Sequence, residues 1–217
     1  MGNRRKNITP AIVIDLDGTL VSVNTFHHFM LFVAKIAARK LQIFSLLRIF
    51  LAVASRALRI VHHSTMKHDV MKIAAKLLSE SQVHYFASKI TQHTNKAVEN
   101  IITDAHRRGA VVILASAAPA LYASHIAIIT GCDHCIATEM PNHIRINECR
   151  GPVKLARVTD FLSANNMALR AVVTDHHDDL PLIQASIGLG AKTILVSPHK
   201  ATINALRNAG ISCYSTL

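Results

Sequence analysis

Short apolar runs that alternate with helical segments are the feature of this sequence that most restricts its fold. The runs occupy residues 11–14, 110–115, 170–174 and 192–196, and they are rich in alanine, valine, isoleucine and leucine. Runs that are continuous, rather than alternating with polar residues, are typical of strands buried on both faces of a sheet. Repeated strand–helix units favour a parallel sheet with right-handed crossovers. The sequence therefore predicts an α/β fold built on a parallel sheet.

A long helical region interrupts this alternation after the first strand. Residues 26–108 show helical periodicity and contain no convincing strand. Two of the expected helices lie near residues 65–79 and 81–108, the second ended by Gly109. We therefore predict a core domain and an inserted helical domain: residues 1–20 and 110–217 for the core, and residues 21–109 for the insertion.

The first part of the helical region carries an apolar stripe. Its members recur at steps of three and four residues, as in an amphipathic helix: Ile43, Leu47, Phe50, Ala54, Leu58 and Val61. Basic residues interrupt the region, so we do not expect a transmembrane span. Two interpretations stay open. The favoured one is a helix packed in an ordinary helical subdomain, and the other is a basic amphipathic helix in peripheral contact with an anionic membrane.

The charge balance indicates the kind of partner. A net charge of +11 favours phosphorylated metabolites, an anionic membrane surface or nucleic acid. Because the basic residues are scattered and aromatic residues are few, we expect a small phosphorylated substrate and no nucleic acid. The basic N-terminus, residues 1–6, precedes a strand rather than a signal-peptide core, which favours a cytoplasmic protein.

Polar side chains follow the predicted strands at the points where these strands end. They come from four places along the chain: Asp15 and Asp17 with Gly18, then Ser116, then Lys154 at the start of a helix, then Asp175 to Asp179. The carboxyl ends of parallel strands share one edge of a sheet, so these groups can converge. Taken singly, each fits an ordinary turn, helix cap or surface residue. Their order along the chain favours one site.

These residue types suit phosphoryl transfer. Asp15 can attack phosphorus and form an aspartyl-phosphate, and Asp17 can protonate the leaving oxygen and then activate water. Asp175 can complete a Mg²⁺ site with Asp15 and the main-chain carbonyl of Asp17, since oxygen ligands suit this ion. Ser116 and Lys154 can bind the phosphoryl oxygens.

Three further residues complete the predicted site. Gly18 permits the sharp turn after the first strand and is assigned to the phosphate-binding set. Asp179 can hold Lys154 or a metal-bound water. Asp178, next to it, is assigned a supporting role.

With these residues in this order, the chain resembles the haloacid dehalogenase-like hydrolase superfamily. Its four motifs are matched by Asp15-Leu-Asp17-Gly-Thr19, Ser116, Lys154 and Asp175-x-x-x-Asp179. The helical insertion resembles a C1-type cap, and the branch it is most similar to is the phosphoserine phosphatase-like one. The resemblance implies a Rossmann-like core with helices on both faces of the sheet. It also implies a mobile cap over a Mg²⁺-dependent phosphatase site.

Two positions depart from the phosphoserine phosphatase branch. Asn24 stands where those enzymes carry a glutamate that binds the amino group of the substrate, and Asp178 stands where asparagine is common. Both departures argue against L-phosphoserine as the substrate. Three alternatives to a phosphatase of soluble metabolites stay open: a phospholipid head-group phosphatase similar to phosphatidylglycerophosphatases at the inner membrane surface, a phosphomutase, and a non-catalytic phosphate-binding protein.

Overall fold

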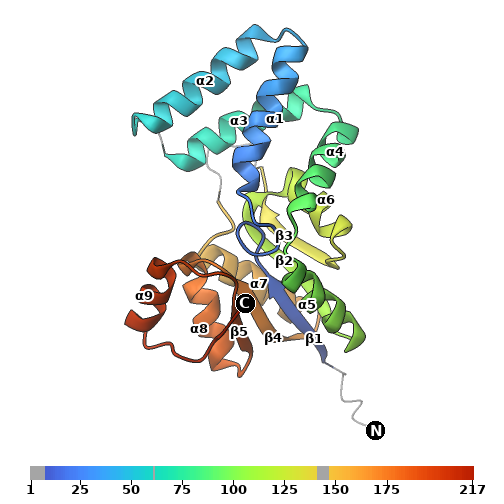
Figure 1. The fold of residues 1–217 in the computed structure, drawn as a ribbon, viewed down its shortest axis with the longest axis vertical. Helices are drawn as coiled ribbons and strands as arrows, with labels where there is room; N and C mark the ends of the chain where they lie inside the picture. The colour runs from blue at the N-terminus through green and yellow to red at the C-terminus, as the bar shows by residue number, and fades with distance from the viewer. Residues whose placement is uncertain (1–7, 61, 141–146) are drawn as a thin grey trace.

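The computed structural model describes residues 8–60, 62–140 and 147–217, so the basic N-terminal stretch lies outside it. Within these residues, six parallel strands form one sheet in the order β3-β2-β1-β4-β5-β6 (Figure 1). Their bounds are β1 Thr9–Ile14, β2 Val111–Pro119, β3 His134–Thr138, β4 Met167–Thr174, β5 Lys192–Leu195 and β6 Ser215–Thr216. The predicted α/β fold with a parallel sheet is confirmed.

Both faces of the sheet are covered, which explains why residues 11–14 of β1 are all apolar. The helices that cover it are α5 Lys96–Arg107, α6 Ala120–Ile129, α7 Pro152–Ala164 and α8 Leu180–Gly188. Ala11 and Val13 belong to a core cluster with residues of α7 and α8. Ile12 and Ile14 point the other way and belong to a cluster with residues of α5 and α6. The predicted helices on both faces are confirmed.

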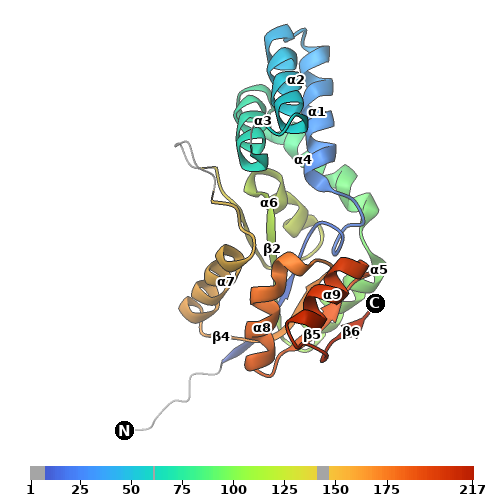
Figure 2. The ribbon, with the colours of Figure 1, turned by 90° about the vertical axis from the view of Figure 1, so that its left-hand side faces the viewer.

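A helical insertion follows β1, as predicted. It comprises α1 Thr25–Arg39, α2 Ile43–Ala57 and α3 His63–Leu77. Figures 1 and 2 show these three helices at the end of the molecule opposite α8 and α9 (Lys200–Asn208). The carboxyl end of β1 points toward them, so the insertion lies above the edge of the sheet where the predicted site residues are found.

The single helix predicted over residues 81–108 is wrong, because the chain forms two helices there. α4 (Glu80–Ile90) is followed by a 3-10 turn, Thr91–His93, and then by α5. Asn95 starts α5 by accepting a hydrogen bond from the N–H of Ala97 at 3.0 Å, a side-chain cap that begins a new helix. α5 lies within the predicted insertion, residues 21–109, yet it packs on the sheet. The bounds of the inserted domain stay a prediction.

The apolar stripe of α2 does not face a core. Ile43, Leu47 and Phe50 are exposed, whereas the buried residues of this helix are Ile49 and Ala52. The favoured interpretation of a helix packed in a helical subdomain is confirmed, since α2 contacts α1 and α3, but it does so through the face opposite this stripe. Among the helices that the structure describes, none is both long and apolar enough to cross a membrane.

Candidate active site

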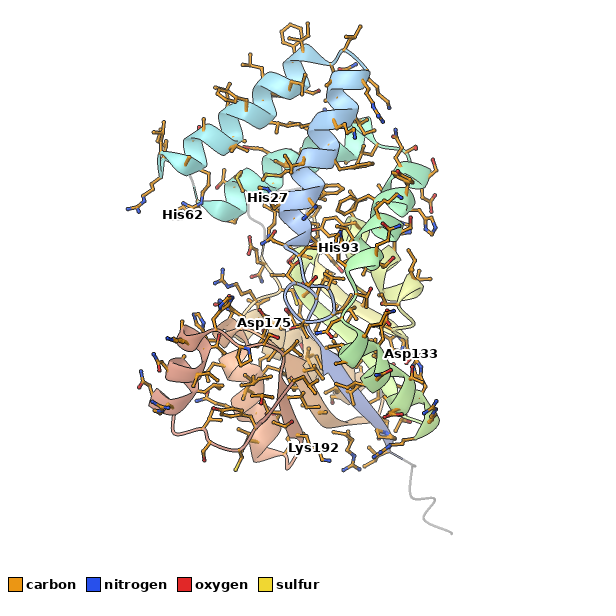
Figure 3. The ribbon with its side chains drawn as sticks, in the orientation of Figure 1. His27, His62, His93, Asp133, Asp175 and Lys192 are labelled. Atoms are coloured by element: carbon orange, nitrogen blue, oxygen red, sulfur yellow. The ribbon has the colours of Figure 1, made fainter. Side chains whose placement is uncertain are left out.

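The carboxyl ends of β1, β2 and β4 meet at one edge of the sheet, below the helical insertion. A cavity of about 430 Å³ lies there. It is lined by all the residues that the sequence assigned to the site: Asp15, Asp17, Gly18, Ser116, Lys154, Asp175, Asp178 and Asp179. Figure 3 shows Asp175 at the end of the core that faces the insertion, and Lys192 at the opposite end. The fold thus brings residues from both ends of the sequence into one cavity.

Lys154 joins two carboxylates that come from different segments. Its side chain lies in the first turn of α7 and is only 3% exposed. Its Nζ lies 2.6 Å from Oδ1 of Asp15 and 2.8 Å from both carboxylate oxygens of Asp179. The hydroxyl of Thr174 also donates to Oδ2 of Asp179, at 2.7 Å. Asp179 therefore holds Lys154, which was one of the two roles considered for it.

Burial and charge act in opposite directions on this ion pair. Burial raises the pKa of Asp15, the ammonium of Lys154 lowers it, and the resulting pKa is about 7. Burial alone would lower the pKa of Lys154, but the charges of Asp15 and Asp179 outweigh that effect and raise it. Lys154 therefore stays protonated, while Asp15 ionises near neutral pH. This is the range in which a nucleophilic carboxylate has to be ionised.

Asp17 is oriented by the start of α1. Its Oδ1 accepts a hydrogen bond from the N–H of Thr25 at 2.6 Å, and the partial positive charge of a helix N-terminus favours this contact. Burial raises the pKa of Asp17, and the hydrogen bonds from Thr25 offset that effect only in part. A raised pKa suits a carboxyl group that has to donate a proton. Asn24 caps the same helix by accepting a hydrogen bond from the N–H of His27 at 2.9 Å.

Gly18 makes room for Asp175. Its φ of +78° lies in the left-handed region, and a Cβ at this position would overlap Oδ2 of Asp175. Thr19 donates to Oδ1 of Asp175 at 3.1 Å, and burial raises the pKa of Asp175. The N–H of Gly18 donates to the carbonyl of Val21 at 2.8 Å, which closes the turn after β1. The assignment of Gly18 to phosphate binding stays a prediction.

Ser116 lies inside β2 rather than after it, because this strand continues to Pro119. Its side chain is buried, and Oγ accepts a hydrogen bond from the N–H of Ala118 at 3.1 Å. The register between β2 and β3 shifts between Ala115 and Pro119, an irregularity of the kind that re-aims side chains near active sites. Pro119 is the N-cap of α6.

Asp178 adds a carboxylate that has its own partners. Its Oδ2 lies 2.6 Å from Nη2 of Arg150 and 2.9 Å from Nδ1 of His176. Burial alone would raise the pKa of Asp178, but the hydrogen bond from Arg150 and the nearby histidine outweigh it, and the pKa is lowered. The arginine therefore offsets the repulsion that a further negative charge would exert on a bound phosphate.

Lys67 of α3 also lines this cavity, and the sequence did not reveal it. It is 5% exposed, and its Nζ lies 3.1 Å from the carbonyl oxygen of Ala117 and 3.2 Å from Oε1 of Glu148. The same Nζ lies 5.5 Å from the ring centre of Phe26, within the range of a cation–π contact. No motif marks Lys67 among the many basic residues of the insertion, and only the tertiary structure brings it to the site.

The cavity offers oxygen ligands of the kind that a magnesium ion prefers. Asp15, Asp17 and Asp175 all line it, and burial raises the pKa of each carboxyl group. Lys154 contacts Oδ1 of Asp15 and Thr19 contacts Oδ1 of Asp175, so Oδ2 of each carboxylate can serve a cation. A hard cation with oxygen ligands would relieve the repulsion among these half-buried carboxylates.

Comparison with known proteins identifies one family. The model of that family, described as haloacid dehalogenase-like hydrolase, matches residues 12–184. No curated protein matches the sequence.

Solved structures with low sequence identity share the fold. A protein of unknown function from Bordetella pertussis Tohama I has a TM-score of 0.72 at 16% identity, over 97% of this chain and 99% of that one. A probable phosphoserine phosphatase from Vibrio cholerae has a TM-score of 0.67 at 9% identity, over 98% and 62%. A phosphoserine phosphatase with a phospho-aspartyl intermediate analogue has a TM-score of 0.57 at 15% identity, over 95% and 93%.

Proposed function

Because this chain belongs to the haloacid dehalogenase-like hydrolase family, we propose that it is a Mg²⁺-dependent phosphomonoester hydrolase that acts through an aspartyl-phosphate on Asp15. One observation carries the proposal: Asp15 lines a cavity beside Asp17 and Asp175, with its Oδ1 2.6 Å from the ammonium of Lys154. Positive charge beside the nucleophile suits attack on an anionic phosphoryl group, which would otherwise repel it. The phospho-aspartyl analogue in a phosphoserine phosphatase of similar fold supports the same chemistry.

The proposed reaction consists of two displacements at phosphorus. In the first, a carboxylate oxygen of Asp15 attacks phosphorus, the bond to the ester oxygen breaks, and Asp17 gives its proton to that oxygen. In the second, Asp17 takes a proton from a water molecule whose oxygen attacks phosphorus, and the bond to Asp15 breaks. One water is consumed, an alcohol and inorganic phosphate are released, and both aspartates return to their starting states.

The other residues of the cavity hold the phosphoryl group. Lys154 and the hydroxyl of Ser116 bind its oxygens, and Lys154 also offsets charge among the carboxylates. A magnesium ion held by Asp15, Asp175 and the main-chain carbonyl of Asp17 would supply further positive charge. Lys67 reaches the cavity from α3 and contacts the substrate from the side of the cap.

The residues at the mouth of the cavity argue against phosphoserine. Asn24 lines the cavity, and its Oδ1 accepts a hydrogen bond from the α1 backbone, so this position supplies no carboxylate for a substrate ammonium. Lys67 and Arg150 line the same cavity and favour an anionic substrate without an amino group there. A panel of phosphorylated metabolites and lipids, assayed with purified protein, identifies the substrate.

Replacement of Asp15 with asparagine tests the nucleophile. We expect the wild type to hydrolyse p-nitrophenyl phosphate with Mg²⁺ and to stop when EDTA is added. Asp15→Asn should lower turnover by at least about a thousandfold while the circular dichroism spectrum stays unchanged. The matched control is Asp160→Asn, because Asp160 is exposed on α7 and outside the cavity. Normal turnover by Asp15→Asn would remove Asp15 from the nucleophile role.

Replacement of Asp17 with asparagine tests the two-step reaction. p-Nitrophenolate leaves without a proton, so Asp17→Asn should slow hydrolysis of the intermediate more than its formation. We therefore expect phosphorylated protein to accumulate in the Asp17→Asn variant. Its phosphoryl group should be removed by hydroxylamine, and the Asp15→Asn variant should not become phosphorylated. Direct hydrolysis without an intermediate would give no label in either variant.

A phosphomonoester carried by a lipid is the second candidate substrate. The exposed apolar face of α2 favours it, since this face belongs to the helical insertion that lies above the cavity. The chemistry at Asp15 would be the same for both substrate classes.

A further inference from the structure

The outer face of α2 carries a row of exposed apolar side chains. Phe44 is 84% exposed, Ile43 71% and Leu58 72%, and three others with at least half of their surface exposed are Leu47, Phe50 and Leu51. Scattered exposed apolar residues are normal in proteins, but a row along one helix face is not. We call these six residues the α2 face.

The α2 face lies on the outside of the molecule. Figure 2 shows α2 at the end of the insertion, packed beside α1 and α3 and far from the sheet. Leu41 (82% exposed) and Ile60 (71% exposed) extend the apolar surface beyond the two ends of the helix. The apolar surface therefore runs along the whole length of α2.

The insertion that carries the α2 face is rich in basic residues. Between positions 35 and 76 the chain has nine lysines and arginines and a single carboxylate, Asp69. Arg48 and Arg56 are exposed on α2 itself, and Lys72 and Lys76 are exposed on the neighbouring α3. Apolar side chains beside exposed basic residues are the composition of helices that lie in the interface of an anionic bilayer.

A hollow of about 830 Å³ lies next to this face, between α2 and α3. Its wall combines apolar side chains such as Phe44 and Leu51 with three basic ones and one carboxylate: Arg48, Lys72, Lys76 and Asp69. An amphiphile with an anionic head group and an apolar tail is complementary to such a wall, because each part meets its own kind of surface.

We propose that the α2 face is the surface by which this protein docks on an anionic lipid bilayer. Two other occupants fit less well. A second copy of the chain, paired face to face by two-fold symmetry, would bring the basic residues of two insertions close together. A nucleic acid would be bound by the basic residues but would leave the aliphatic side chains of Ile43, Leu47 and Leu58 without apolar partners.

Co-sedimentation with vesicles tests the proposal without any use of catalysis. The probes are vesicles of phosphatidylcholine alone and vesicles of equal parts phosphatidylcholine and phosphatidylglycerol. We expect the wild type to pellet with the anionic vesicles at low salt, to stay in solution with the neutral ones, and to bind less at about 0.5 M sodium chloride. A protein that stays in the supernatant with anionic vesicles at low salt overturns the proposal.

Substitutions on the α2 face locate the surface. Phe44→Asp with Phe50→Asp should abolish pelleting, because two apolar anchors become negative charges. Its matched control is Ile128→Asp with Leu189→Asp, which makes the same change at exposed positions outside the insertion. Pelleting of the α2 variant to the wild-type extent overturns the proposal.

Removal of basic residues separates charge from apolar contact. Arg48→Gln with Arg56→Gln should weaken partitioning by about fivefold for each arginine removed. Arg170→Gln with Lys192→Gln is the control, because both residues are exposed on the sheet, and Figure 3 shows Lys192 at the end of the core opposite the insertion. Equal losses in both variants would show that total charge, rather than this face, controls binding and would overturn the proposal.

Light scattering and an activity assay separate membrane docking from dimer formation and from catalysis. Light scattering of the free protein should show the same mass for the wild type and the Phe44→Asp, Phe50→Asp variant; a dimer that this variant dissociates would assign the face to a second copy instead. The same variant should hydrolyse p-nitrophenyl phosphate at the wild-type rate. Failure of the catalytic proposal would therefore leave the vesicle result unaffected, and the reverse also holds.

Discussion

The cavity at the sheet edge and the α2 face depart from the usual burial pattern in opposite ways. The cavity buries charged groups such as Lys154 and Asp179, whereas the α2 face exposes apolar groups such as Phe44. In the cavity the buried charges have partners, since Lys154 lies within 2.8 Å of both Asp15 and Asp179. On the α2 face the apolar groups have no such internal partners among the described residues, and they are available to something outside the chain.

This difference shows where each region gets its stability. Burial of an ion pair carries a large desolvation penalty that good geometry only balances. Each buried charge in the cavity is therefore stable only while its oppositely charged partner is present. Loss of one partner there is expected to be severe. An exposed apolar side chain contributes little to folding, so loss of one on α2 should affect binding rather than stability. The predictions below test this contrast, beginning with the largest effect.

Lys154→Met should destabilise the protein by about 3–5 kcal/mol, because it leaves the carboxylates of Asp15 and Asp179 buried without their cation. Chemical denaturation measures the free energy of unfolding. The control is Lys192→Met, at an exposed position where we expect a change within about 0.5 kcal/mol. If Lys154→Met is as stable as that control, the buried charges do not depend on one another as proposed.

Gly18→Ala should reduce activity far more than it reduces stability. Gly210 is a matched control, because its φ of +73° resembles the +78° of Gly18, yet its Cβ would meet no atom within 4 Å. Alanine at either position should cost about 1–2 kcal/mol of backbone strain. Only Gly18→Ala should also displace Asp175, seen as a higher Mg²⁺ concentration for half-maximal turnover of p-nitrophenyl phosphate. Equal effects on turnover would show that the close approach to Asp175 has no function.

Mg²⁺ should raise the melting temperature more at pH 8 than at pH 5.5. The pKa of Asp15 is raised from 3.8 to about 7, so the folded protein without metal keeps this proton up to near neutral pH. The stability of that form therefore falls as the pH rises from 3.8 to about 7. Because Mg²⁺ binds the ionised form, protons compete with it at pH 5.5. We expect the stabilisation to be about 2–4 °C larger at pH 8. The difference should shrink in Asp15→Asn and persist in Asp160→Asn.

Phe44→Ser should have the smallest effect on folding, within about 0.5 kcal/mol, because Phe44 is exposed in α2. Phe29 is the internal contrast. It is fully buried and its ring centre lies 5.0 Å from that of Phe86, so Phe29→Ser should cost at least about 3 kcal/mol. Thermal melts of both variants measure the difference. A large loss of stability in Phe44→Ser would show that the α2 face is packed in solution.

The central strands and the site residues could be predicted because their signals are local. Residues 11–14 are apolar at every position, a pattern typical of a strand that is covered on both faces. Asp15, Lys154 and Asp175 could be assigned to one place, since parallel strands present their carboxyl ends at one edge. The cavity that contains all three agrees with that reasoning.

Local patterns were less informative in the insertion. The periodicity of Ile43, Leu47 and Phe50 correctly indicated a helix, but periodicity does not tell whether an apolar face meets a core or solvent. The hydrogen bond from Ala97 to Asn95, which separates α5 from α4, involves an asparagine that sequence reasoning passed over. Lys67 could not be identified at all, because its role depends on where α3 lies relative to β2.

The sequence by itself determined the parallel sheet and the set of groups at its edge, because strand burial and motif spacing are properties of neighbouring residues. Only the tertiary structure decided which partners those groups have. Lys154 lies between Asp15 and Asp179, Lys67 enters from α3, and the stripe of α2 faces outward. The physical reason is that ion pairing and burial depend on distances between segments far apart in the chain, and no local pattern contains those distances.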